Sequence, residues 1–209
     1  MSKHICITIA RQYGSGGREI GELVAKELNI PIYDKELITE AASKENLNEE
    51  VLRNADESAT NSLLYTVAMG STSLGAAMHF GYKMPLNDRL FLLQSEVIRE
   101  CAKSGSGVYI GRCADYVLRE EPCLLRVFIH GDLAHREARV KARHPELKSS
   151  QIINVIEKTD KRRSTYYNFY TGNKWGHFEN YDLLVNSSTL GIQGTAKLIA
   201  DLAKKMLEK

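Results

Sequence analysis

The sequence predicts a single α/β domain, spanning residues 1–209, in which helices cover both faces of a five-stranded parallel sheet. Five short apolar segments alternate with helical patterns along the chain, and this alternation is typical of three-layer α/β domains. A glycine-rich loop joins the first of these segments to the first helix. The chain has 209 residues, of which 43% are hydrophobic, which is enough for one hydrophobic core and short for two.

The first two strands flank the first predicted helix. Residues 5–10 form an apolar run rich in β-branched side chains, as expected of a buried parallel strand. After the glycine-rich loop, the apolar residues from Ile20 to Leu28 recur at helical spacing and form one stripe. Pro31 prevents the helix from continuing, so residues 31–33 are predicted as a short second strand.

The remaining elements follow in the same alternation. Residues from 35 onward have a helical pattern, whereas residues 46–85 are less regular and indicate one or two helices around a hinge rich in Gly and Ser. The other predicted elements are a helix at 88–103, strands at 108–110, 124–130 and 182–186, a helix at 132–143 capped by Asp132, a helix capped by Ser149 or Ser150, and a final helix from Thr195.

Composition excludes several classes of function. The net charge of +2 gives no strong global attraction to nucleic acid. No stretch of about 18 consecutive apolar residues indicates a membrane span, and the N-terminal apolar run is too short for a secretory signal, so we expect a cytoplasmic protein. The four cysteines form no C-x-x-C pair and no zinc-binding spacing, and we expect free thiols and no metal site.

The glycine-rich loop has the features of a phosphate-binding site. Glycines allow backbone N–H groups to approach an anion closely, and the N-terminus of the following helix adds positive potential. The usual P-loop pattern is G-x-x-x-x-G-K-[ST], but no lysine follows the glycines here; Arg18 comes closest, and Arg11 is a second candidate. With the register shifted by one, Gly17 occupies the lysine position. The residues expected to surround nucleotide phosphates are Arg11, Tyr13, Gly14, Ser15, Gly16, Gly17 and Arg18.

Two other readings of this loop stay open. A dinucleotide-binding loop would need G-x-G-x-x-G, and the third glycine is missing, although Asp34 lies where a ribose-binding acid would be expected. A purely structural turn is the other reading, but three glycines between a buried strand and a helix are unfavourable without a ligand.

Arginines farther along the chain could stabilise the charge of a transferred phosphoryl group. Arg136 and Arg139 are three residues apart on one predicted helix, and Asp160 and Arg163 are three apart on the next, so each pair shares a helical face. Both helices follow a strand that should end beside the glycine loop, where ligands of open α/β sheets bind. A solvated basic surface is the alternative reading.

Two further pairs of polar residues directly follow strands. Arg112 and Asp115 come after the strand at 108–110, where an arginine suits a substrate phosphate. Asp34 and Lys35 come after the second strand, at the same edge of the sheet. Asp34 could orient an acceptor, hold magnesium-bound water, or cap the helix that begins there.

Several segments of the chain together resemble one protein family. They are residues 7–21 (ITIARQYGSGGREIG), 31–38 (PIYDKELI), 108–115 (VYIGRCAD) and 158–167 (KTDKRRSTYY), followed by Trp175 and Tyr181-Asp182-Leu183. This pattern resembles the cytidylate kinase-like family of P-loop kinases. The resemblance implies a three-layer αβα P-loop NTPase fold with strand order 2-3-1-4-5. It also implies a helical NMP-binding insertion at 35–87 and a lid arm at 132–170, which close over the substrates.

The resemblance also implies an activity and roles for individual residues. It implies transfer of a phosphoryl group from ATP, which carries Mg²⁺, to a nucleoside monophosphate, CMP or dCMP in true cytidylate kinases. Those enzymes carry G-K-[GS]-T where this chain has Gly-Gly-Arg-Glu. By resemblance, Arg112 would hold the acceptor phosphate, Asp160 and Arg163 would serve the lid side of the acceptor site, and Arg136 and Arg139 would face ATP. The catalytic residues would be Arg18, Arg136, Arg139 and Arg163, and the substrate-binding residues Asp34, Lys35, Arg112, Asp115, Asp160 and Arg163.

The sequence therefore leaves three hypotheses of function. The first is an ATP-dependent kinase of small molecules, most simply of nucleoside monophosphates, with no nucleic-acid or membrane partner. The second is a nucleotide-binding sensor or interaction protein without transfer activity, suggested by the missing loop lysine. The third is an NAD-dependent oxidoreductase. Leu63, Leu64, Leu74 and Met78 could bury against a second copy of the chain, giving a homodimer, or against the chain's own sheet.

Overall fold

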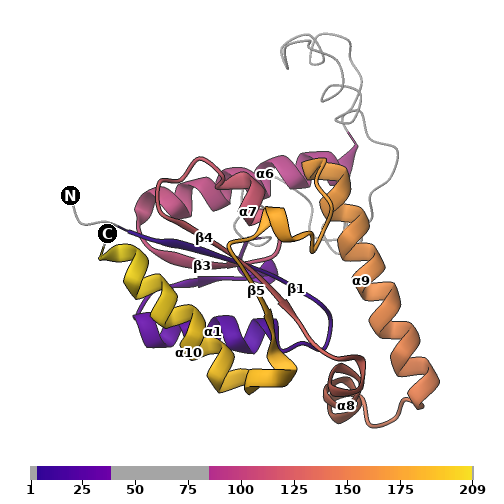
Figure 1. Cartoon of the computed structure of the whole chain (residues 1–209). Coiled ribbons are helices and arrows are strands. Elements are labelled where there is room, and N and C mark those ends of the chain that lie inside the picture. The colour runs from indigo at the N-terminus through magenta and orange to yellow at the C-terminus, as the bar shows by residue number, and fades with distance from the viewer. Residues whose placement is uncertain (1–3, 39–84, 209) are drawn as a thin grey trace.

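The computed structural model describes residues 4–38 and 85–208 and contains one five-stranded sheet (Figure 1). The strand order is β2-β3-β1-β4-β5, and every neighbouring pair is parallel. This result confirms the predicted fold class and strand order. The predicted insertion, including Leu63, Leu64, Leu74 and Met78, lies almost entirely outside the described residues.

The elements have the following bounds. The strands are β1 (Cys6–Arg11), β2 (Ile32–Tyr33), β3 (Gly107–Ile110), β4 (Leu124–His130) and β5 (Leu183–Asn186). The helices are α1 (Gly17–Leu28), α6 (Leu86–Ser104), α7 (Ala114–Val117), α8 (Leu133–Arg143), α9 (Ser149–Thr171), a 3₁₀ turn at Phe178–Asn180, and α10 (Ser187–Leu207).

The hydrophobic core lies on both faces of the central strand β1. Ile7 and Ile9 are fully buried on one face, where they pack in the same cluster as Ile20 of α1 and Ile199 of α10. On the other face, Cys6 packs in a cluster with residues of α6 and α7. Figure 1 shows α1 and α10 on one side of the sheet and α6 and α7 on the other. Burial on both faces explains why β1 is a continuous apolar run.

Helices α8 and α9 pack against each other and form an arm beyond the C-terminal end of β4 (Figure 1). Val140 of α8 packs against Ile152 and Ile156 of α9, and all three are fully buried. The helical spacing of these apolar residues in the sequence therefore forms the interface between the two helices. The arm lies beside the glycine-rich loop, because Tyr13 of that loop packs against the same cluster.

The structure corrects three predictions about helix ends. Helix α9 begins at Ser149, so its N-cap residue is Lys148 and neither Ser149 nor Ser150. The last helix begins at Ser187 instead of Thr195, with a kink at Gly191, whose backbone has φ 67° and ψ 176°. Asp132 precedes α8 but its side chain makes no capping hydrogen bond; instead its carboxylate accepts one from Asn186 Nδ2 at 3.0 Å.

Of the described helices, none combines the length and the apolar character that crossing a membrane requires.

Candidate active site

The glycine-rich loop connects β1 to α1 in a conformation that depends on its glycines. Gly14 and Gly16 have φ values of 83° and 80°, in the left-handed region that side chains with a Cβ rarely adopt. Ser15 Oγ donates a hydrogen bond to the carbonyl oxygen of Gln12 at 2.9 Å, and Ser187 Oγ donates one to the carbonyl of Ser15 at 2.7 Å. These bonds hold the loop on the last helix of the chain.

Neighbouring helices approach the loop so closely that no side chain fits at two of its positions. A Cβ on Gly14 would lie 2.8 Å from the carbonyl oxygen of Arg136 in α8. A Cβ on Gly16 would collide with the end of the Ile192 side chain in α10. The glycines thus satisfy both the backbone torsions and the available space.

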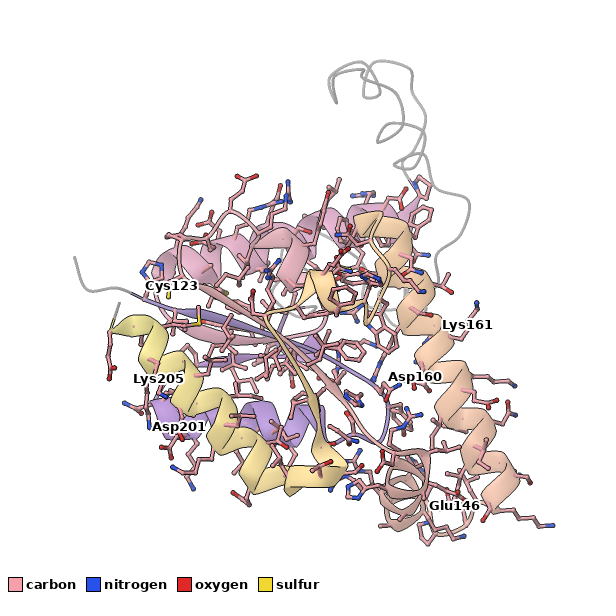
Figure 2. The ribbon with its side chains drawn as sticks, in the orientation of Figure 1. Cys123, Glu146, Asp160, Lys161, Asp201 and Lys205 are labelled. Atoms are coloured by element: carbon pink, nitrogen blue, oxygen red, sulfur yellow. The ribbon has the colours of Figure 1, made fainter. Side chains whose placement is uncertain are left out.

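The arm holds the loop through a half-buried carboxylate. Asp160 of α9 accepts a hydrogen bond from the backbone N–H of Tyr13 at 2.7 Å. It also forms an ion pair with Arg136 of α8, whose Nη1 lies 2.5 Å from Asp160 Oδ2. Arg136 Nη1 also lies 3.3 Å from the Tyr13 carbonyl. Figure 2 shows Asp160 on the side of α9 that faces the sheet, and Lys161 on the opposite side. Arg139 contacts the start of α1, where its Nη2 is 2.5 Å from Glu19 Oε2.

A cavity of about 250 Å³ opens above the loop, at the carboxyl ends of β1, β2 and β3. Ligands of open α/β sheets bind at this edge. Glycines of the loop and cationic side chains from distant segments line the same space, which suits an anion. The lining residues include Gly14, Gly16 and Gly17, together with Arg11, Arg18, Lys35, Arg143, Arg162 and Arg163.

A second, smaller cavity adjoins the first, and Arg11 and Arg163 line both. Its wall includes Arg112 and Cys113, two successive residues with φ of 57° and 54° in the left-handed region. Such torsions are costly for residues with side chains and persist where the surroundings enforce them, often at functional sites. Arg112 is buried, and its guanidinium lies 5.9 Å from the ring centre of Tyr166.

Asp115, on α7, lies buried in the wall of the smaller cavity. The hydroxyl of Tyr167 donates a hydrogen bond of 2.6 Å to Asp115 Oδ2. Burial raises the pKa of the Asp115 carboxyl, and this effect outweighs the opposing effect of that hydrogen bond. The cavity therefore contains a carboxyl group whose neutral form the protein favours.

We expect Asp115 to make the protein less stable as pH rises. Because the folded-state pKa is raised, the unfolded chain releases its proton first, and the free energy of unfolding falls from about pH 4 upward. In Asp115→Asn this pH-dependent component should be absent. The difference in the free energy of unfolding between wild type and Asp115→Asn should therefore change with pH. Urea titrations at several pH values measure it.

The matched control for this experiment is Asp182→Asn. Hydrogen bonds from Arg126 lower the pKa of Asp182 despite partial burial, so its stabilising contribution is present at neutral pH and is lost as pH falls below about 4. The difference in the free energy of unfolding between wild type and each variant should therefore change with pH in opposite directions for the two variants. Parallel trends in the two variants would contradict the assignment for Asp115.

Arg18 and Asp34 contact each other at the rim of the larger cavity. Arg18 Nη2 lies 2.7 Å from Asp34 Oδ2, and the same guanidinium lies near Glu22 at 3.2 Å and Glu36 at 3.6 Å. Asp34 Oδ1 also accepts a hydrogen bond from the N–H of Leu37 at 3.0 Å, which confirms that it caps the following helical turn. Arg18 is therefore neutralised by three carboxylates in this arrangement.

The structure brings together most of the residues predicted from the sequence. The loop apart from Ser15, which is fully buried, lines the larger cavity together with Arg18, Asp34, Lys35 and Arg163. Arg112 and Asp115 line the smaller one. Arg136, Arg139 and Asp160 lie behind the loop, where they hold other protein groups. Sequence reasoning missed Ser187, which holds the loop through the carbonyl of Ser15. Ser187 directly follows β5, so the rule that strand ends meet at one edge could have found it.

A family model extends the match over most of the chain. The model of the cytidylate kinase-like family matches residues 6–189, which include the loop, both cavities and the arm. The chain belongs to the cytidylate kinase-like family. None of the curated proteins compared with the chain matches it.

Solved structures agree with this membership. An uncharacterized protein from Eubacterium ventriosum ATCC 27560 is 27% identical with a TM-score of 0.74, covering 97% of this chain and 99% of that one. Shikimate kinase from Bacteroides thetaiotaomicron is 11% identical with a TM-score of 0.54, covering 97% and 99%. TT1252 from Thermus thermophilus is 15% identical with a TM-score of 0.51, covering 97% and 98%. The last two likenesses show the fold alone. Fold and family together support phosphoryl transfer as the general class of chemistry.

Proposed function

We propose that this member of the cytidylate kinase-like family transfers a phosphoryl group from ATP to a small acceptor, with CMP and dCMP as the first candidates. The observation that carries the proposal is the pair of adjoining cavities that share Arg11 and Arg163. The larger one is bordered by the loop amides and suits the polyphosphate of the donor. The smaller one is bordered by Arg112 and suits the anionic end of an acceptor.

The residues of the site suit a mechanism of positioning and charge stabilisation. The loop amides and the N-terminus of α1 would bind the donor phosphates. Arg163 would contact the group in transfer, because it lines both cavities. No covalent intermediate with the protein is required. Arg136, Arg139 and Asp160 would act by holding the loop in shape.

Magnesium fits this site as a companion of ATP. No group of three or more His, Cys, Asp or Glu side chains that could hold a metal occurs within residues 4–38 and 85–208. The carboxylate of Asp34 lines the larger cavity and would hold water molecules of an ion carried by the phosphates. Such an ion supplies positive charge next to the phosphate oxygens.

We expect Arg112→Ala to weaken binding of the acceptor and to leave binding of ATP unchanged. Arg112 lines the smaller cavity only, so its loss should raise the KM for the acceptor by about tenfold or more. The KM for ATP should stay within about twofold of wild type. Initial rates measured with each substrate varied in turn separate the two constants. Equal increases in both would contradict an acceptor role for Arg112.

The test of the proposed function is a panel of acceptors. Purified protein is incubated with ATP, Mg²⁺ and CMP, dCMP, UMP or AMP, and formation of ADP and of the diphosphate product is followed. We expect turnover with CMP or dCMP and slower or no turnover with AMP. Phosphorylation of another acceptor would keep the transfer reaction and change only its specificity.

A second candidate function is nucleotide binding without transfer. The observation that favours it is the glycine at position 17, where P-loop kinases carry lysine. Tight ATP binding, with no acceptor phosphorylated in the panel, would support it. The oxidoreductase hypothesis receives no support, because β3 lies between β1 and β2, whereas dinucleotide-binding sheets have the order 3-2-1-4-5-6.

A further inference from the structure

The side chain of Arg11 runs across two glycines at the floor of the site. A Cβ placed on Gly17 would lie 2.5 Å from Arg11 Cβ and 2.7 Å from Arg11 Cγ. A Cβ placed on Gly111, after β3, would collide with Arg11 Nη1. The aliphatic stem of Arg11 therefore covers Gly17, and its guanidinium lies over Gly111.

Residues 11 and 17 correspond to two fixed positions of the P-loop pattern. With Gly16 as the second glycine of G-x-x-x-x-G-K-[ST], the first glycine falls at residue 11 and the lysine at residue 17. This chain carries arginine at the first place and glycine at the other. Gly17 is the first residue of α1 and does not have the positive φ of Gly14 and Gly16, so the space occupied by Arg11 is what requires a glycine there.

We infer that Arg11 supplies the phosphate-binding cation that a lysine at position 17 would otherwise supply. The inference rests on the proposed function for the identity of the ligand. Arg11 lines both cavities, and its own carbonyl accepts a hydrogen bond of 3.0 Å from Arg163 Nη1, so arginines from β1 and α9 border the same space. A guanidinium is always charged and can donate two parallel hydrogen bonds to phosphate oxygens. In this chain the phosphate-binding cation would therefore lie at the end of β1, whereas the usual P-loop lysine lies at the start of the helix.

The contrast with Arg18 supports this assignment. Arg18 follows the glycines in sequence and is the closest match to the missing lysine, but its guanidinium lies between Asp34, Glu22 and Glu36. Its side chain is 58% exposed at the rim, whereas Arg11 lies between the two cavities. We therefore assign the phosphate contact to Arg11 and the rim position to Arg18.

The first experiment measures binding of ATP with Mg²⁺, and of adenosine, by isothermal titration calorimetry. Arg11→Met keeps the aliphatic stem over Gly17 and removes the charge. It should weaken ATP binding by about tenfold to a hundredfold and change adenosine binding by less than about twofold, since adenosine has no phosphate group for a guanidinium to contact. Arg119→Ala, which removes an arginine lining neither cavity, should bind ATP as wild type does. Thermal denaturation of each variant verifies the fold.

The second experiment transplants the cation. Gly17→Lys alone should bind ATP poorly because the new side chain meets the Arg11 stem, but Arg11→Gly combined with Gly17→Lys should recover most of the affinity lost in Arg11→Gly. Recovery in the double variant supports an exchange of roles between the two positions. Equal ATP affinity in Arg11→Gly and the double variant would overturn that exchange.

The outcomes separate this inference from the proposed function. Wild-type protein that binds ATP, together with an Arg11→Met variant that binds it equally well, would overturn the role of Arg11 and leave the proposed function intact. Wild-type protein that does not bind ATP would overturn both. Weaker ATP binding in Arg11→Met, with unchanged adenosine binding and an intact fold, supports the inference.

Discussion

Replacement of Arg163 by alanine is expected to lower the turnover number by about a hundredfold or more while the protein stays folded. Arg163 lines both cavities, donates a hydrogen bond to the carbonyl of Arg11, and lies 5.7 Å from the ring centre of Tyr13. A guanidinium held at this place faces the region between donor and acceptor. Charge spreads over the phosphoryl oxygens in the transition state, so the lost stabilisation should appear mainly in kcat.

Two variants on the same helix serve as controls for this prediction. Arg163→Lys retains the charge without the planar fork, so it should recover only part of the rate. Lys161→Ala removes a cation on the side of α9 that faces away from the sheet, and it should retain wild-type kcat (Figure 2). The measurement is kcat at saturating ATP and acceptor, with the melting temperature of each variant. Wild-type kcat in Arg163→Ala would remove Arg163 from the mechanism.

Local sequence determines most of the sheet, and the structure confirms those elements. The strand predicted at residues 124–130 has the bounds of β4, because most of its residues are apolar and Gly131 directly follows it. The predicted start of the last helix, Thr195, was wrong because residues 187–190 are mostly polar and precede Gly191, a pattern typical of a loop. The structure begins the helix at Ser187 because Asn186 accepts a hydrogen bond from the N–H of Ser188 at 2.9 Å and caps it.

The candidate site was less predictable because its contacts join distant segments. Helical spacing placed Arg136 and Arg139 on one face, but it could not show that one would meet Asp160 and the other Glu19, 120 residues away. Position along the chain also favoured Arg18 as the replacement for the lysine, since it follows the glycines directly. The role inferred for Arg11 depends on the path of its side chain over Gly17, which only the three-dimensional arrangement reveals.

Replacement of Asp160 by alanine is expected to have the largest effect on stability. Its carboxylate and the Arg136 guanidinium form an ion pair in which the side chains are only 16% and 10% exposed. Removing one partner leaves a buried charge without compensation, so the free energy of unfolding should fall by about 3 kcal/mol. The N–H of Tyr13 loses its acceptor as well, so the glycine-rich loop should lose order and ATP should bind more weakly. Urea denaturation and calorimetric titration with ATP measure the two effects.

Asp160→Asn separates the charge of this carboxylate from its hydrogen bond. The amide oxygen can still accept from the N–H of Tyr13, whereas the charge opposite Arg136 is gone. If the loop hydrogen bond governs binding, Asp160→Asn should bind ATP more tightly than Asp160→Ala while remaining less stable than wild type. Arg136→Met tests the pair from the other side, and combined with Asp160→Asn it should be less destabilising than the sum of the two single changes, because neither charge is then buried alone. Additive losses in the double variant would contradict the clamp that joins α8, α9 and the loop.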